Sequence, residues 1–137
     1  MISRENNELL TRVEHDAPMG VMLRENHWIP ALRAGRLVRN GAPVHVRLLG
    51  KDFVAFRAAD DRVGFFDEKC PHRGVSLVLA RNEDCALRCL FHGMKFHVEG
   101  RVVEAPTQSG NAEAFCASVK LAHYPVREAG GLIWVWL

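Results

Sequence analysis

The sequence predicts an all-β fold, a small antiparallel sandwich or barrel preceded by one short helix. Three observations lead to this prediction. Apolar and polar residues alternate along several short segments after residue 43, which is the period of a half-buried strand. Turn-forming Gly and Asp residues separate these segments. The chain has 137 residues, of which 48% are apolar, and this is enough for one domain with its own core.

The helix is expected near the N-terminus, over residues 3–13. Leu9, Leu10 and Val13 lie at helix-compatible spacing, and the side-chain oxygen of Ser3 can cap the first turn. No later segment has the pattern of a long helix. The remainder of the chain is therefore expected to consist of strands and loops.

The first hairpin is expected over residues 44–57. Val and Leu alternate with His and Arg along residues 44–48, and the return strand, FVAFR, occupies residues 53–57. Between them, Gly50–Asp52 has the composition of a tight turn. The two segments are therefore predicted to pair in antiparallel fashion.

Two later strands are expected to end at cysteine-containing loops. Asp60–Asp61 turns the chain into a strand over residues 62–67, shortly before Cys70. After the second such loop, residues 95–103 form a hairpin whose turn is Glu99–Gly100, because glycine accepts positive φ. Both cysteine loops are therefore predicted to lie at strand ends.

The C-terminal third combines a loop with further strands. Residues 107–114, TQSGNAEA, are small and polar and predict a surface loop, and residues 119–126 resume alternation. Residues 130–137, GGLIWVWL, would be apolar on both faces of a strand. Two interpretations are open. In the first, the segment is a buried central strand. In the second, the outer face of the strand is covered by an interface or by another part of a longer polypeptide.

Charge and cysteine content exclude several classes of protein. The formal net charge is only +2, with 18 basic and 16 acidic residues intermixed, so neither a nucleic acid nor a membrane is an expected partner. The N-terminus lacks the apolar stretch of a secretory signal, and no apolar run approaches the roughly 18 residues of a membrane helix. We therefore expect a cytoplasmic protein, whose four cysteines bind metal or fill the core.

Two segments, CPHRG at residues 70–74 and CLFHG at residues 89–93, indicate a metal site. Each supplies one Cys and one His and ends in Gly, and sixteen residues separate the two pairs. Such a set suits tetrahedral zinc or an iron–sulfur cluster with mixed ligands. A one-residue gap between Cys and His is less usual for zinc, so the spacing favours the cluster. The four candidate ligands are Cys70, His72, Cys89 and His92.

These residues resemble the Rieske signature, here C-x-H-x16-C-x-x-H. Flanking segments such as HWIPAL and YPVREAGGLIW are similar to the Rieske domain of ring-hydroxylating oxygenases, particularly the oxygenase component of the phthalate 4,5-dioxygenase type. The resemblance covers nearly the whole chain and implies a Rieske-type sandwich or barrel, with a 2Fe-2S cluster held between two loops. One departure is Met94, where relatives usually have Trp.

The resemblance also implies a domain organisation. Residues 1–43 would be an N-terminal extension packing on a Rieske domain at residues 44–137. Cluster-binding loops are expected at residues 69–75, the first loop, and at residues 88–94, the second loop. Respiratory Rieske proteins carry an extra Cys after each ligand pair, and this chain does not, so no disulfide is expected between the loops.

The implied function is electron transfer. In the family, a flavin-containing reductase supplies electrons, which pass through the cluster to a mononuclear iron in a further domain, and the complete proteins form trimers. The histidines outside the motif form no two-His-one-carboxylate pattern, so we expect a non-catalytic part of an oxidoreductase. The alternatives are a stand-alone Rieske ferredoxin and a structural zinc domain.

Five other residues near the motif have simpler explanations. Cys85 and Cys116 are expected to be small core residues, because free cysteine is among the most buried residue types. His97 alternates with apolar neighbours and is expected to face solvent. Arg73 and Lys95 flank the loops, and they would either steer an acidic partner or simply be solvated.

Overall fold

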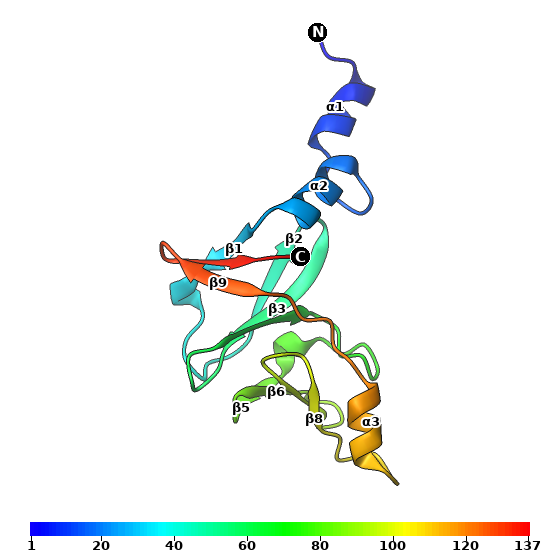
Figure 1. Ribbon diagram of the computed structural model, residues 1–137, viewed down its shortest axis with the longest axis vertical. Helices are drawn as coiled ribbons and strands as arrows, with labels where there is room; N and C mark the ends of the chain where they lie inside the picture. Colours follow the sequence, from blue (N-terminus) through cyan, green and yellow to red (C-terminus); the bar gives the residue numbers. More distant parts are fainter.

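Ten strands form three antiparallel sheets in the computed structural model, which describes all residues from 1 to 137 (Figure 1). The sheets have the strand orders β1-β10-β9, β2-β3-β4 and β5-β6-β7-β8. This confirms the predicted all-β class. The strand bounds in chain order are β1 (Ile29–Arg33), β2 (Val44–Leu48), β3 (Lys51–Arg57), β4 (Val63–Asp67), β5 (Arg81–Glu83), β6 (Ala86–Arg88), β7 (Lys95–His97), β8 (Val102–Glu104), β9 (Val126–Ala129) and β10 (Leu132–Val135).

In the sheet β2-β3-β4, the strands β3 and β4 are buried on both faces, whereas β2 has one exposed face. Phe53 and Ala55 of β3 belong to one apolar cluster, whereas Val54 and Phe56 belong to another, because successive side chains of a strand point to opposite faces. One cluster packs toward β1-β10-β9 and the other toward β5-β6-β7-β8. Burial on both sides explains why residues 53–56 read as a continuous apolar run.

The apolar C-terminal segment is a central strand buried on one face, so the structure confirms its central position, and a covering of its other face stays a prediction. β10 lies between β1 and β9, and its residues Ile133 and Val135 are fully buried. On its other face and beyond its end, Trp134 and Trp136 are only half-buried. The ring of Trp136 meets the ring of Trp28 edge-on at 5.7 Å between centroids.

The predicted N-terminal helix is present as α1 (Arg4–Thr11). The side chain of Ser3 caps it by accepting a hydrogen bond from the backbone N–H of Asn6 at 3.2 Å. Leu9 and Leu10 stay more than half exposed, and α1 lies at one end of the molecule, away from the sheets (Figure 1). Its amphipathic face is therefore not part of the core.

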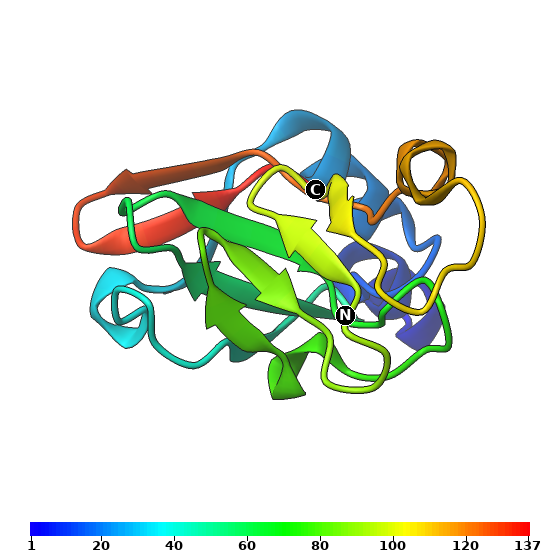
Figure 2. The same cartoon turned by 90° about the horizontal axis from the view of Figure 1, so that it is seen from below.

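Two further helices were not expected from the sequence. The helix α2 (Pro18–Asn26) begins with Pro18. Proline is common at the first position of a helix, so Pro18 was a sequence signal for this helix that the prediction did not use. The helix α3 (Ala112–Ser118) lies within the segment predicted as a loop, capped by the side chain of Asn111. It packs beside β8 (Figure 2). Residues 119–125 make only isolated bridges, so the strand expected at residue 119 begins at Val126.

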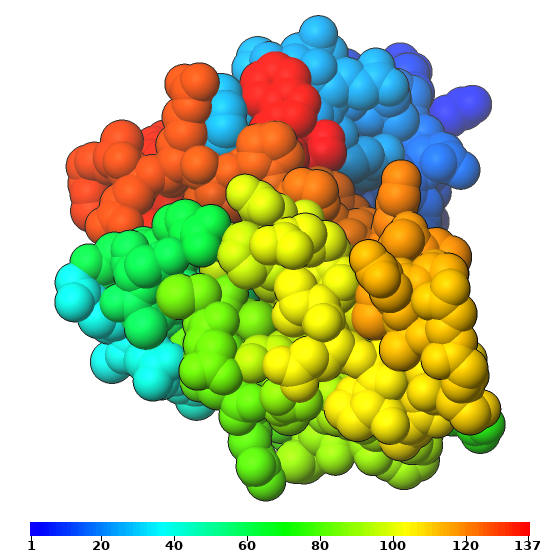
Figure 3. Space-filling view, turned by 60° about the horizontal axis from the view of Figure 1, so that its bottom comes forward, coloured from blue at the N-terminus to red at the C-terminus, as the bar shows by residue number.

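The sheet β5-β6-β7-β8 and α3 form the end of the molecule opposite α1 (Figure 1). Seen from that end, the surface over residues 80 to 105 lies directly beside α3 (Figure 3). None of the helices is long and apolar enough to cross a membrane.

Candidate metal centre

The two cysteine loops are copies of one backbone turn. In Cys70–Val75 and in Cys89–Met94, the cysteine N–H donates to the carbonyl oxygen five residues later at 2.8 Å. The N–H of the glycine four residues after each cysteine donates back to the cysteine carbonyl oxygen, at 2.8 Å for Gly74 and 3.1 Å for Gly93. Both glycines have positive φ, +70° and +72°, which side chains with a Cβ rarely adopt.

Strand pairing closes each turn at its base. Lys69 and Ser76 form an antiparallel bridge under the first loop, just after β4 ends. Under the second loop, Arg88 of β6 pairs with Lys95 of β7. The loops are therefore matched in length, in hydrogen bonding and in their attachment to strands, which confirms that both lie at strand ends.

The two thiols lie in the core beneath the loops. Cys70 and Cys89 are each only 3% exposed and belong to the same apolar cluster. Burial raises the pKa of Cys70 to about 11, and the backbone amides of His72 and Arg73 oppose this shift while the neighbouring Cys89 thiol adds to it. A metal would have to displace the thiol protons, since thiolate is the ligating form.

The two imidazoles lie next to each other at the surface. The ring centroids of His72 and His92 are 4.6 Å apart and the rings cross at 69°. His72 is exposed and His92 is half-buried. The ring centroids of His92 and Phe91 are 4.1 Å apart. Desolvation, followed by the neighbouring His72 and Arg73, lowers the pKa of His92 and favours the neutral imidazole, which is the form that binds metal.

The structure thus brings all four predicted residues together in two pairs. Cys70 and Cys89 are buried in one apolar cluster, and the imidazoles of His72 and His92 lie next to each other nearer the surface. No point in the structure gathers three or more His, Cys, Asp or Glu side chains in a way that suits one metal ion. A Rieske-type 2Fe-2S cluster takes two Cys on one iron and two His on the other, so this donor set fits it.

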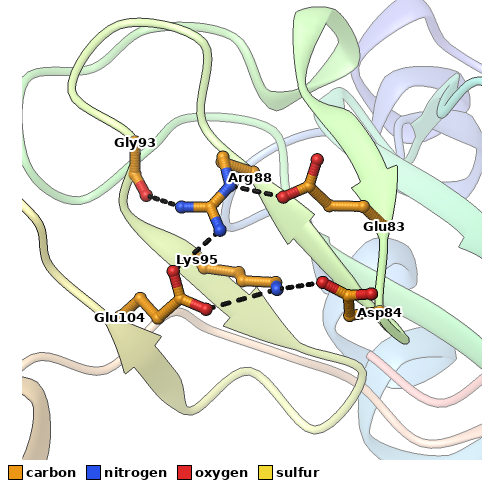
Figure 4. Close-up of polar contacts among 6 residues, drawn as sticks. All are labelled: Glu83, Asp84, Arg88, Gly93, Lys95 and Glu104. Carbon is orange, nitrogen blue, oxygen red and sulfur yellow. Dashed lines mark hydrogen bonds and ion pairs between the residues drawn. The ribbon is translucent and has the colours of Figure 1, made fainter.

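A network of ion pairs supports the second loop (Figure 4). The guanidinium of Arg88 donates to the carbonyl oxygen of Gly93 at 2.9 Å, to Glu83 at 2.5 Å and to Glu104 at 2.7 Å. Hydrogen bonds from Arg88, and then from Lys95, lower the pKa of Glu104, so its carboxylate stays ionised. Sequence reasoning did not identify Arg88, because its three partners meet only in the folded sheet.

Lys95 is buried, so the expectation that it lies at the surface was wrong. Its side chain is 6% exposed, and its ammonium donates to Asp84 at 2.8 Å and to Glu104 at 3.3 Å. The hydrogen bond with Asp84 is the largest factor raising the pKa of Lys95. The burial of this lysine is offset because two more exposed carboxylates pair with its ammonium. Arg73, the other basic residue considered near the motif, lies in the first loop and is exposed.

The expectation that His97 faces solvent was also wrong. Its side chain is 15% exposed, and its Nε2 lies 3.2 Å from a guanidinium nitrogen of Arg62. Its Nδ1 is buried without a hydrogen-bond partner. Cys85 and Cys116 are half-buried against the core as expected, and all four cysteines are free. Neither of these two enters the candidate site.

Comparisons with known proteins identify relatives of the chain. The family described as Rieske [2Fe-2S] domain matches residues 27–125. The phthalate 4,5-dioxygenase oxygenase subunit of Pseudomonas putida is 48% identical, over 100% of this chain and 31% of its own length. The 3-chlorobenzoate-3,4-dioxygenase oxygenase subunit of Comamonas testosteroni is 46% identical, with the same coverage. The chain therefore spans about a third of the length of these curated relatives.

Solved structures show the same fold. Dicamba monooxygenase, crystallised with non-heme iron and dicamba, superposes with a TM-score of 0.73 at 29% identity, covering 83% of this chain and 33% of that chain. A second structure is the reduced complex between oxygenase and ferredoxin in carbazole 1,9a-dioxygenase. It superposes with a TM-score of 0.65 at 27% identity, covering 82% of this chain and 28% of that chain.

Proposed function

The chain belongs to the Rieske 2Fe-2S domain family, and we propose that it carries electrons as the Rieske domain of an aromatic ring-hydroxylating oxygenase component. Its cofactor is the Rieske-type 2Fe-2S cluster of that family. The observation that supports this function most directly is the pairing of two buried thiols with two surface imidazoles on matched loops.

In this proposal Cys70 and Cys89 would hold one iron, and His72 and His92 would hold the other. When bound, the cluster accepts and releases one electron at a time. The burial of both cysteines keeps water away from the thiolates, and the backbone amides of the first loop favour the anionic form of Cys70. The imidazoles are the part of the site closest to solvent, so they provide the route by which an electron reaches a partner.

The proposed partners are those that the resemblance to ring-hydroxylating oxygenases implies. A flavin-containing reductase would deliver the electron, and a mononuclear iron domain outside these 137 residues would receive it, in a complete protein that forms a homotrimer. A solved relative that contains an oxygenase together with a ferredoxin supports an external protein donor. We further propose that residues 44–137 are the Rieske domain and residues 1–43 its extension. The length of the encoding reading frame distinguishes this arrangement from a stand-alone ferredoxin.

A cytoplasmic location remains part of the proposal. It is supported by the four free cysteines, two of them half-buried, since thiols persist in a reducing compartment.

Metal analysis and spectroscopy of the purified chain test the proposal. We expect two irons and two acid-labile sulfides per chain and an EPR signal after reduction with dithionite. The reduction potential should lie above the roughly −400 mV of plant-type all-Cys ferredoxins, because neutral imidazoles replace two thiolates. It should lie near the roughly −150 mV end of the Rieske range, because the chain lacks the loop disulfide and some of the hydrogen bonds that would raise the potential further. A colourless, zinc-loaded and EPR-silent protein would contradict it.

A further inference from the structure

Besides the place of the histidine, the two matched loops differ in the side chain immediately before the cysteine. The first loop has Lys69 at this position, which is exposed and makes no side-chain hydrogen bond or ion pair. The second loop has Arg88, whose side chain is 24% exposed and hydrogen-bonded to three partners. The turns are the same, so this difference is not required by the shape of the turn.

Arg88 joins the second loop to the sheet below it. Its guanidinium reaches Glu83 on β5, Glu104 on β8 and the carbonyl oxygen of Gly93 in the loop (Figure 4). A guanidinium presents several N–H donors in a rigid plane, whereas a lysine ammonium in this position could not reach all three acceptors with the same geometry.

Further ion pairs hold Arg88 in this orientation. Glu104 accepts from Arg88 with one oxygen and from Lys95 with the other, and Lys95 also donates to Asp84. The Lys95 side chain is 6% exposed, whereas its partners Asp84 and Glu104 are 80% and 46% exposed, so the lysine stem is held by packing and its ammonium pairs with carboxylates at the surface. The guanidinium therefore has a fixed position relative to three strands of the sheet.

The contact with Gly93 fixes the residue that follows His92. The N–H of Gly93 donates to Cys89, and its carbonyl oxygen accepts from Arg88, so both peptide groups beside the Gly93 Cα are held. Glycine is otherwise the residue with the greatest backbone freedom. In the first loop, the N–H of Gly74 is bonded in the same way, but its carbonyl oxygen accepts no hydrogen bond.

We propose that Arg88 is a positioning residue that fixes the Gly93 backbone and thereby the orientation of the His92 imidazole. The inference rests on the proposed function in so far as His92 is a cluster ligand. It adds an asymmetry, because only the second loop is fixed to the sheet by a side chain. The first loop keeps its shape through its backbone hydrogen bonds and Gly74 alone.

Hydrogen–deuterium exchange of the whole chain tests the positioning role without reference to the cluster. In Arg88→Met and Arg88→Lys, exchange at residues 89–94 should accelerate about tenfold, the factor expected for losing a hydrogen bond to a charged group. Exchange at residues 70–75 should not change. Lys69→Met is the matched control and should leave both loops at wild-type rates. Unchanged exchange at residues 89–94 in the Arg88 variants overturns the inference.

EPR of the reduced holoprotein tests the consequence for His92. Arg88→Lys should shift or broaden the signal, while Lys69→Met retains the wild-type spectrum. A variant with lower thermal stability but a wild-type EPR spectrum would show a merely structural role and overturn the inference. If Arg88→Met does not fold, Arg88→Lys and Glu83→Gln provide the comparison. If the wild-type protein assembles no 2Fe-2S cluster, the proposed function is refuted. The hydrogen–deuterium exchange rates at residues 89–94 then test the positioning role of Arg88 separately.

Discussion

The backbone N–H of Gly93 donates to the carbonyl oxygen of Cys89 at 3.1 Å, and this bond closes the second loop around a glycine with φ of +72°. The first loop is closed by the same bond between Gly74 and Cys70. Backbone hydrogen bonds and a left-handed glycine therefore determine the shape of both loops, and the sheets determine how the loops face each other.

Alanine at the two loop glycines should have unequal effects. Each change costs about 1 kcal/mol of the free energy of unfolding, because a residue with a Cβ is strained at this φ. In Gly93→Ala the new Cβ would also lie 3.3 Å from a ring carbon of Pro106, whereas at Gly74 it would meet nothing within 4 Å. Urea denaturation should therefore show a larger loss for Gly93→Ala, and equal losses would contradict this account.

Gly64→Ala should destabilise the core by about 1–3 kcal/mol or more. A Cβ at this position would lie 2.2 Å from a ring carbon of Phe56, which is fully buried on the paired strand. Gly35→Ala is the matched control, since its Cβ would have no neighbour within 4 Å, and it should stay within about 0.5 kcal/mol of wild type. Thermal denaturation of both variants measures the difference.

Met94 should tolerate replacement by leucine but not by alanine. Met94 is 4% exposed and packs in the same group of buried apolar side chains as Cys70 and Cys89. Met94→Ala leaves a cavity and should cost about 2–5 kcal/mol, whereas Met94→Leu conserves volume and should cost less than about 1.5 kcal/mol. Chemical denaturation measures both values. Similar losses in the two variants would mean that the surrounding side chains close the cavity.

The stability of the protein should fall below neutral pH partly because of His97. Burial, together with Arg101 and Arg62, lowers the pKa of His97, against opposing contributions from Glu99 and Asp60. Below the unfolded-state pKa of about 6.5, the unfolded chain therefore binds more protons than the folded chain. The contribution of His97 to stability is present above that pH and is lost as the pH falls toward the folded-state pKa.

Replacing His97 by Gln should flatten this part of the pH profile. Melting temperatures measured between about pH 5 and pH 7.5 should decline less steeply with acidification in His97→Gln than in wild type. His27→Gln is the control, because His27 is exposed and makes no side-chain hydrogen bond. A profile for His97→Gln as steep as that of wild type would remove His97 as the cause.

Substitution of the motif residues should separate ligands from core cysteines. Cys70→Ala or His92→Ala should abolish the assembled cluster, because either change removes a proposed ligand. Cys85→Ala should retain full iron content and an unchanged EPR spectrum, since Cys85 packs against the core outside the site. Equal loss of iron and of EPR signal in all three variants would refute the ligand assignment.

Alternation and turn residues were sufficient to predict most strands and both loop positions. They failed where the local signal was weak. The helix α3 has a small, polar sequence, and its stability depends on the Asn111 cap and on contact with β8. For Lys95 and His97, the residue type indicated exposure, but the folded sheets bury both and bring Asp84 and Glu104 to Lys95 and Arg62 to His97. Arg88 was missed for the same reason.

The amino-acid sequence alone determined the family, the two Cys–His pairs and the short hairpins, because each depends on residues close together in the chain. Only the tertiary structure decided that the two thiols share one core, that the two imidazoles meet at the surface and that a single arginine joins three strands to the second loop. Those relationships depend on sheet pairing between distant segments, and pairing distances are not contained in any local pattern.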